Sequence, residues 1–389
     1  IEKLLEHYDE LSDHIKVETK DPDLYPKFTS QYTDQTVAAN SVIAVCGDKS
    51  KVVSNSDMWE TSTNYQTYQT QTTGFDGEGQ ITSAITYVTS ENNPKVYWVT
   101  GHGEASESDL STNFSDAINK NNVEISDLAL MTDDIPEDAE ELVIMSPTTD
   151  FSEDEANKVI TYLENGGKLL MFTSYTGTDM PNLDSILENY GVKRSSGIVV
   201  ETDSQHYYPQ MPYYLLPNIQ SDDITTEVKS NYILMPVAQA IQKLDSYRDT
   251  ITIKSLLTTT EDAYIENDPE NSTWSKSADS ETGAFDLGVS ITETVDDKET
   301  QIIYFSSASM LSSQIDQAIS GANSKLAATA LTSMCDVEQT VVIPSKSTSY
   351  TNLVFTQGAV NTWSIITIAG IPLVLVVIGV MIWMKRRKQ

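Results

Sequence analysis

One short segment of the sequence combines residue types that could take part in chemistry. It reads VYWVTGHGE over residues 96–104, so an apolar run ends in Gly101, His102, Gly103 and Glu104. In open α/β sheets, ligands bind beyond the carboxyl ends of strands, where a loop of this kind would lie. An imidazole and a carboxylate can transfer protons, bind a metal ion, or contact a ligand or partner. We therefore take these four residues as the candidate ligand or partner contact.

Residue types elsewhere argue against catalysis at this loop. A dinucleotide fingerprint needs a third glycine where Ser106 stands, and the acidic residues that follow would repel a pyrophosphate. A zinc site usually needs three protein ligands, yet the four histidines show no HExxH spacing, and His206 is the only second imidazole to consider. No G-x-S-x-G or G-x-C-x-G elbow and no P-loop occurs. The sequence predicts no catalytic residue, no metal and no cofactor.

A structural role for the loop is the favoured interpretation, with contact to a ligand or partner as an addition to it. Gly101 and Gly103 would allow a tight turn, while His102 and Glu104 hydrogen-bond to neighbouring loops. Tyrosines at 207, 208, 213 and 214, together with Trp98, could instead stack on sugar rings, although such clusters more often pack in cores or interfaces.

Charge and length restrict the function classes. The 389 residues contain 57 Asp+Glu and 24 Lys+Arg, a net charge of −33. Such a length allows two or three domains. Nucleic-acid binding is excluded because phosphate contacts need a basic surface. Cys46 and Cys335 have no CxxC partner, so two free thiols and one long-range disulfide are both possible.

The strongest physical signal lies near the carboxyl end. Residues 364–384 contain no charge and span about 31 Å as a helix, close to the thickness of the bilayer hydrocarbon. Trp363 and Trp383 stand near its ends, and four basic residues, 385–388, follow. The positive-inside rule places those basic residues in the cytoplasm. Residues 1–363, which contain all of the Asp and Glu, are then predicted to lie outside the cytoplasm.

Strands and helices alternate regularly after Pro94. Ser152 and Glu155 form a capping-box pattern that opens a helix through Leu163. Near-continuous apolar strands separated by helices of about a dozen residues predict an α/β domain with a doubly wound, mainly parallel sheet. The strands expected in this part are Val96–Thr100, Val123–Leu130, Glu141–Ser146 and Lys168–Thr173, with a further helix at Leu110–Lys120.

The rest of the exterior part is less regular. At the amino end we expect a helix over residues 1–11, strands at His14–Glu18 and Ser41–Val45, and a polar linker over residues 54–80. After Gly191 we expect strands at Gly197–Glu201, Ile251–Leu257, Phe285–Thr292 and Gln301–Phe305, helices at Val237–Lys243 and Asn323–Met334, and a mobile exterior loop at Glu261–Ser280.

These patterns divide the chain into five segments. Residues 1–92 form an amino-terminal α/β module, and residues 93–335 form the larger α/β ectodomain. Residues 336–363 form a stalk, because the stretch contains Pro344 and is rich in Ser and Thr. Residues 364–384 form a transmembrane helix, and residues 385–389 form a basic cytoplasmic tail.

Four stretches together resemble the GldG-like auxiliary component of poorly characterised, gliding-motility-related ABC transport systems. The most specific is VYWVTGHGE at 96–104. The others are the opening IEKLLEHYDELSDHIKVETKDPD, the ELVIMSP strand at 141–147 with NGGKLLMF at 165–172, and IPSK at 343–346 before the span. The resemblance covers essentially the whole chain. The chain departs from it in lacking a first helix and strand before Ile1, which we attribute to truncation.

The resemblance implies a non-catalytic, membrane-anchored, extracytoplasmic subunit that works with an ABC transporter permease and ATPase. It implies a glutamine-amidotransferase-like fold without the nucleophile, a thioredoxin-like amino-terminal module, and a cell-membrane location with a second, amino-terminal span. An envelope carbohydrate or peptide is the expected substrate class. The alternative is a membrane-tethered envelope hydrolase or carbohydrate-binding protein that uses the GHGE loop.

Overall fold

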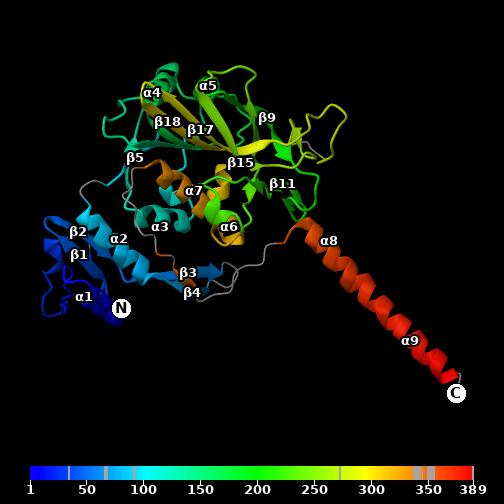
Figure 1. Cartoon of the computed structure of the whole chain (residues 1–389), viewed down its shortest axis with the longest axis horizontal. Helices are drawn as coiled ribbons and strands as arrows, with labels where there is room; N and C mark the ends of the chain where they lie inside the picture. Colours follow the sequence, from blue (N-terminus) through cyan, green and yellow to red (C-terminus); the bar gives the residue numbers. More distant parts are fainter. Residues whose placement is uncertain are drawn as a thin grey trace. The chain divides into compact units, whose positions relative to one another are not determined.

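The computed structural model describes residues 1–33, 36–64, 69–90, 93–270, 273–335, 343, 345–347 and 355–387. The chain forms two compact units (Figure 1). The amino-terminal unit contains residues 1–96, 115–126 and 335–351, and the main unit contains residues 97–114, 127–334 and 352–389. The predicted boundary at 92 and most of the predicted stalk lie outside the described residues.

A large sheet forms the centre of the fold. Its strand order is β16-β9-β14-β17-β18-β8-β7-β5-β6, and β15 pairs with both β17 and β12. The strands are β5 (Lys95–Val99), β6 (Glu124–Leu128), β7 (Glu141–Met145), β8 (Lys168–Phe172), β9 (Val192–Val200), β12 (Asn218–Ile219), β14 (Gln239–Lys243), β15 (Ile251–Thr258), β16 (Tyr264–Glu266), β17 (Asp286–Val295) and β18 (Lys298–Phe305).

The sheet combines a parallel part with an antiparallel part. β7, β8 and β18 run parallel, whereas β18 returns antiparallel to β17 through a two-residue turn. Asp296 and Asp297 form that turn with φ of 49° and 63°, the conformation of a type I′ hairpin turn, which aspartate tolerates well. The predicted α/β class with a large central sheet is confirmed. The antiparallel part comes from the second half of the chain.

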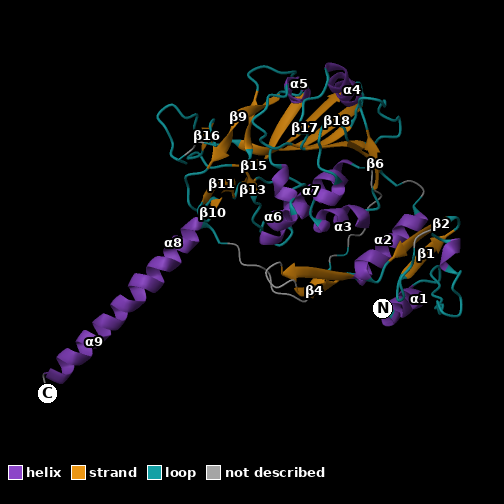
Figure 2. Cartoon of the chain, turned by 180° about the vertical axis from the view of Figure 1, so that it is seen from behind, coloured by secondary structure: helices purple, strands orange, loops and turns teal. Residues whose placement is uncertain are grey.

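Helices cover both faces of this sheet in the main unit (Figure 2). α4 (Glu153–Glu164) and α5 (Pro181–Asn189) lie on one face, and α6 (Ser313–Ala318) and α7 (Ala322–Met334) lie on the other. The capping box that opens α4 is present, with Ser152 and Glu155 exchanging hydrogen bonds. α3 (Thr112–Lys120) follows β5. The arrangement matches the prediction of a sheet covered on both faces.

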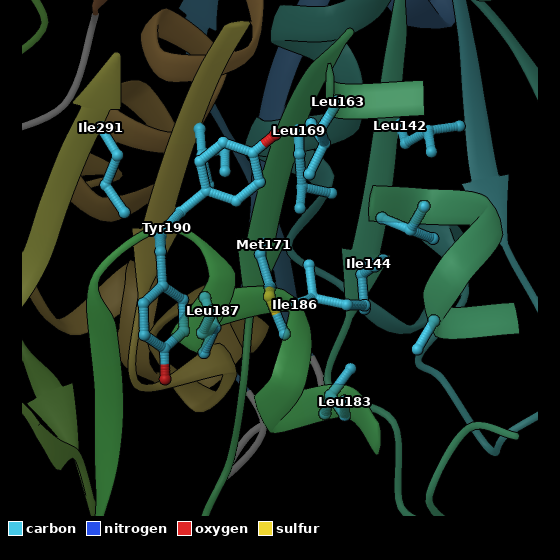
Figure 3. Packing of buried hydrophobic residues seen from close by; sticks show 14 of the residues in the cluster. Leu142, Ile144, Leu163, Leu169, Met171, Leu183, Ile186, Leu187, Tyr190 and Ile291 are labelled. Carbon is cyan, nitrogen blue, oxygen red and sulfur yellow. The ribbon is translucent and has the colours of Figure 1, made fainter. Parts of the chain in front are cut away.

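The core of the main unit packs apolar side chains between the sheet and the first pair of helices (Figure 3). Leu183, Ile186 and Leu187 of α5 are fully buried and belong to the same cluster as Met171 of β8. A fully buried leucine side chain contributes about 1.5–3 kcal/mol relative to exposure. This packing holds the strand ends, and hence the loops that follow them, in fixed positions.

The amino-terminal unit is small and built from antiparallel pairs. β1 (Val42–Cys46) pairs with β2 (Lys49–Val53), and β4 (Gln69–Phe75) pairs with β3 (Trp59–Asn64) and with β19 (Lys346–Ser347). α1 (Glu2–Leu11) and α2 (Gly77–Thr89) complete it, and Val53, Met58 and Ala84 form its buried cluster. The thioredoxin-like character of this unit stays a prediction.

Several expected elements are wrong. Val237–Lys243, predicted as a helix, contains the strand β14, which lies between β9 and β17. The described part of the polar stretch 54–80 contains β3, β4 and the start of α2, and the expected loop at 261–280 contains β16. No strand forms at 14–18. For β14 and β16, pairing with distant strands, which the local pattern does not contain, decides the structure.

The carboxyl-terminal helix is long and apolar. It consists of α8 (Gln357–Ile365), a wide π-type turn (Ile366–Gly370) and α9 (Ile371–Arg387). Pro372 lacks an N–H and crowds the carbonyl four residues earlier, which explains the wide turn just before it. The 31 residues Gln357–Arg387 have a mean hydropathy of 2.9 in their most apolar window, and none of that window is buried. By length and composition this helix could cross a membrane.

Candidate functional site

The GHGE loop lies at the carboxyl end of β5, as expected. Gly101 and Gly103 have φ of +122° and +76°, a region that residues with a β-carbon rarely adopt. Thr100 donates from its backbone to Leu128, and Ala105 donates to Met145 at 3.0 Å. The loop therefore bends sharply while its two ends stay bonded to neighbouring parts of the sheet.

His102 lies between two carboxylates. Its Nδ1 is 3.2 Å from Oε1 of Glu104, and its Nε2 is 3.3 Å from Oε2 of Glu155 in the first turn of α4. The side chains of His102, Glu104 and Glu155 are only 5%, 2% and 4% exposed. Both ring nitrogens can donate to these carboxylates at once only in the doubly protonated imidazolium. The three side chains thus form a buried carboxylate–imidazole–carboxylate cluster.

Glu155 serves two purposes in this cluster. It accepts hydrogen bonds from the Ser152 backbone at 2.9 Å and from the Ser152 hydroxyl at 2.7 Å, and it also faces His102. Burial acts to raise the pKa of Glu155, but the Ser152 hydrogen bonds and the nearby imidazole outweigh it, so the pKa lies below the usual value. The carboxylate form of Glu155 is therefore favoured in the folded protein.

The backbone of His102 is bonded as thoroughly as its side chain. Its carbonyl accepts from the backbone N–H groups of Thr148 and Thr149, at 2.9 and 3.1 Å, and from both threonine hydroxyls. The His102 ring also packs on Phe151, with ring centroids 4.3 Å apart. A β-carbon on Gly103 would lie 2.1 Å from Oγ1 of Thr148, so this position needs glycine for space as well as for conformation.

Trp98 is buried next to the GHGE loop, and its ring is not accessible for stacking on a ligand. It is 1% exposed, and its indole N–H donates to the Ala105 carbonyl at 2.9 Å. The suggestion that Trp98 stacks on a sugar ring is wrong for this reason. Tyr213 also has a partner within the protein, because its ring centroid lies 4.4 Å from that of Trp274.

Ser146 is the nearest counterpart of an activated nucleophile in this region. It follows β7 directly and has φ of +53°, the strained conformation seen where a strand turns sharply into a loop. A nucleophilic serine needs a base within hydrogen-bond reach. The Ser146 hydroxyl donates to the Ser174 hydroxyl at 2.8 Å, while both nitrogens of His102 face carboxylates. The geometry provides no nucleophile–base pair here.

Metal binding finds no support in the parts of the chain that the structure describes. No group of three His, Cys, Asp or Glu side chains there could hold a metal ion. His206 lies in another loop, where its Nδ1 is 3.2 Å from the Leu216 carbonyl. Cys46 and Cys335 are free thiols, so the long-range bridge is absent.

The sequence predicted the position of the GHGE loop but not the contact of His102 with Glu155. Gly101 and Gly103 are exposed, whereas His102 and Glu104 point inward. Glu155 was identified from its spacing to Ser152 as a capping residue only, and no local signal links it to His102, 53 positions earlier. Contact with a ligand or partner through the GHGE loop stays a prediction.

Residues 93–333 match the family described as "ABC-type uncharacterized transport system". The chain belongs to this family of auxiliary ABC transport components. The match spans more than half of the chain and includes both the GHGE loop and α4. No curated protein matches the chain.

Three solved structures are similar to the chain at low identity. The mmIFT52 N-terminal domain is 15% identical, with a TM-score of 0.45, 62% of this chain covered and 96% of that one. A ThuA-like protein from Parabacteroides merdae is 13% identical, with a TM-score of 0.36 and coverage of 68% and 99%. The exo-β-1,4-mannosidase Op5Man5 from an Opitutaceae bacterium is 11% identical, with a TM-score of 0.32 and coverage of 65% and 37%.

Proposed function

We propose that this chain is a non-catalytic, membrane-anchored, extracytoplasmic subunit of a GldG-like ABC transporter. The family match over residues 93–333 and the apolar helix Gln357–Arg387 support a transport role at a membrane. The basic residues that follow the apolar span favour a cytoplasmic carboxyl end. The acidic α/β units would then lie outside the cytoplasm.

The observation that carries the non-catalytic part is the buried cluster around His102. General acid–base catalysis needs a group that can reach the substrate. The His102 ring is nearly inaccessible, and each of its nitrogens already faces a carboxylate. We infer that the cluster fixes the shape of the loop. The exposed parts, Gly101, Gly103 and the serines after Glu104, then form the contact surface.

The proposed partners are the permease and the ATPase of the transporter. The chain has no P-loop, so another chain must hydrolyse ATP if ATP drives transport. A rigid exposed loop at the carboxyl end of a central strand is a suitable place for a partner or for a transported substrate to bind.

Site-specific photocrosslinking tests this proposal. A photoreactive amino acid at Ser108, exposed just after the GHGE loop, is compared with one at Ser277, exposed in a different loop of the main unit. In native membranes, we expect Ser108 to crosslink to an ABC permease or its substrate, identified by mass spectrometry, and Ser277 not to do so.

Two results would contradict the proposal. Purification of the full chain without any permease or ATPase, under conditions that keep other ABC complexes intact, would count against the subunit role. Substrate turnover by the purified chain that disappears in His102→Ala, but not in a Ser277→Ala control, would contradict the non-catalytic role.

A further inference from the structure

A short hairpin beside the apolar helix has an unusual composition. β10 (Tyr207–Tyr208) and β11 (Met211–Leu215) pair through a two-residue turn, and β11 pairs with β13 (Met235–Pro236). We call residues 207–215 the tyrosine hairpin. All of it belongs to the main unit, as does the helix Gln357–Arg387.

The tyrosine hairpin lies within an uncharged stretch of an otherwise acidic chain. Residues 204–221 contain no Asp, Glu, Lys or Arg, although 21% of the whole chain is charged. About four charged residues would be expected in a stretch of this length. The stretch instead contains four tyrosines, a residue type that is enriched where protein meets the lipid headgroups.

Hydrogen bonds attach this stretch to the first turn of α8. The Gly358 backbone N–H donates to the Ser204 carbonyl at 2.7 Å. Gln210, at the tip of the hairpin, donates from its backbone to Oε1 of Gln357 at 2.9 Å. The Thr356 hydroxyl caps the helix and donates to Oε1 of Gln205 at 3.0 Å. The helix therefore starts directly on the hairpin, as the view in Figure 1 also shows.

Helix geometry places the hairpin close to the hydrocarbon. At 1.5 Å per residue, Gly358 lies about 9 Å from Ser364, where the predicted span begins. The headgroup zone of one leaflet is roughly 5–8 Å thick. Trp363, 63% exposed, stands between the two and has the properties of an interfacial anchor. The uncharged stretch, which is bonded to this first turn of α8, would therefore lie at the outer edge of the headgroup zone.

Contacts within the protein do not bury all of the side chains of the tyrosine hairpin. Tyr213 packs against Trp274 in a tilted ring contact, but Tyr207 and Tyr208 are only half-buried, and Met211 is 37% exposed. We propose that the tyrosine hairpin rests in the headgroup zone of a zwitterionic lipid bilayer and fixes the main unit on the membrane surface. This inference rests on the membrane anchoring in the proposed function.

Depth-dependent fluorescence quenching tests the inference on the full chain in phosphatidylcholine vesicles. With Cys46→Ser as background, an environment-sensitive fluorophore is placed on Met211→Cys, and on Met131→Cys as a matched control. Met131 is a 71% exposed methionine of the same unit, outside the hairpin. Gly379→Cys, within α9, reports whether the helix enters the bilayer. Tyr208→Cys serves as a second hairpin site in case Met211→Cys does not fold.

We expect spin-labelled lipid with a shallow nitroxide to quench the hairpin label at least about twofold more strongly than the Met131 label, as interfacial placement requires. Equal quenching at 211 and 131, with strong quenching at 379, would overturn the hairpin inference and leave the anchoring intact. Shielding at 211 that requires added permease would also overturn it, because the occupant would then be protein. Absence of quenching at 379 would overturn the anchoring and the hairpin inference together.

Discussion

At the residue scale, the two glutamates beside His102 determine how the loop behaves. Glu104 receives a hydrogen bond from the His102 backbone N–H at 2.7 Å and faces the ring with its other oxygen. Glu155 closes the cluster from the α4 side and already accepts from Ser152. Because all three groups are buried, replacing any one of them leaves a polar atom without its partner in a place that water does not reach.

Glu104→Gln is expected to lower the free energy of unfolding by about 1–3 kcal/mol, since an amide has one acceptor oxygen and cannot accept from both the His102 backbone N–H and the His102 ring as the two carboxylate oxygens do. Differential scanning fluorimetry of the detergent-solubilised chain would show a fall of several degrees in melting temperature. The control is Glu137→Gln at an exposed glutamate, for which we expect a change within about 0.5 kcal/mol. Equal melting temperatures for both variants would refute the structural role of Glu104.

Glu155 should make stability depend on pH in the acidic range. Its pKa in the folded protein lies below the ordinary 4.5, so its carboxylate stabilises the fold above that pH. The contribution is lost as pH falls through the lower, folded-state pKa. We therefore expect the difference in melting temperature between the native chain and Glu155→Gln to shrink as the pH falls below about 4.5. A difference that grows on acidification would show that the sign is wrong.

At the element scale, the turn that follows β5 requires glycine at position 103 for two reasons: its φ is positive, and a β-carbon there would be too close to Thr148. Gly103→Ala should destabilise the protein by about 1 kcal/mol from its positive φ, and by more because the new methyl group would meet Oγ1 of Thr148. Gly101→Ala would meet no atom within 4 Å, so its loss comes from backbone strain alone. That strain is severe, because a φ of +122° lies outside the left-handed helical region that alanine can adopt. Thermal melts of the two variants compare these costs.

A double-mutant cycle separates the steric part. Thr148→Ala removes the oxygen that the new methyl group would meet. The loss for Gly103→Ala should therefore be smaller in the Thr148→Ala background, whereas the loss for Gly101→Ala should stay the same. Additive effects of Gly103→Ala and Thr148→Ala would mean that the close approach does not contribute.

Local sequence patterns correctly predicted those elements whose structure is determined by their own residues. The helix after Ser152 and the strands at 141–146 and 168–173 are specified by their own caps and apolar runs, and all three form. Val237–Lys243 contains alanines and glutamines that favour a helix, yet β9 and β17 on either side draw it into the sheet. The GHGE loop could be predicted for the same reason as the helix, because its residues are adjacent in the sequence. The contact between His102 and Glu155 could not be predicted, because it depends on tertiary structure.

At the scale of the whole molecule, the orientation across the membrane is the first property to establish. The charge-free span and its basic tail predict that residues 1–363 face outside and that residues 385–389 face the cytoplasm. In intact cells, a membrane-impermeant maleimide should label a cysteine at Ser277 and leave one at Gln389 unmodified until the cells are permeabilised. The reverse pattern, or labelling at both positions in intact cells, would contradict the predicted topology.

The pairing of β19 with β4 has a consequence for biosynthesis. Lys346 and Ser347 pair with Phe75 and Gly74, so the three-stranded sheet of the amino-terminal unit needs residues that are far apart in the sequence. A ribosome adds roughly 5–20 residues per second, and the sheet cannot be completed until more than 270 further residues have followed β4. The amino-terminal unit therefore cannot finish folding until β19, which precedes the apolar helix Gln357–Arg387 in the sequence, has been made.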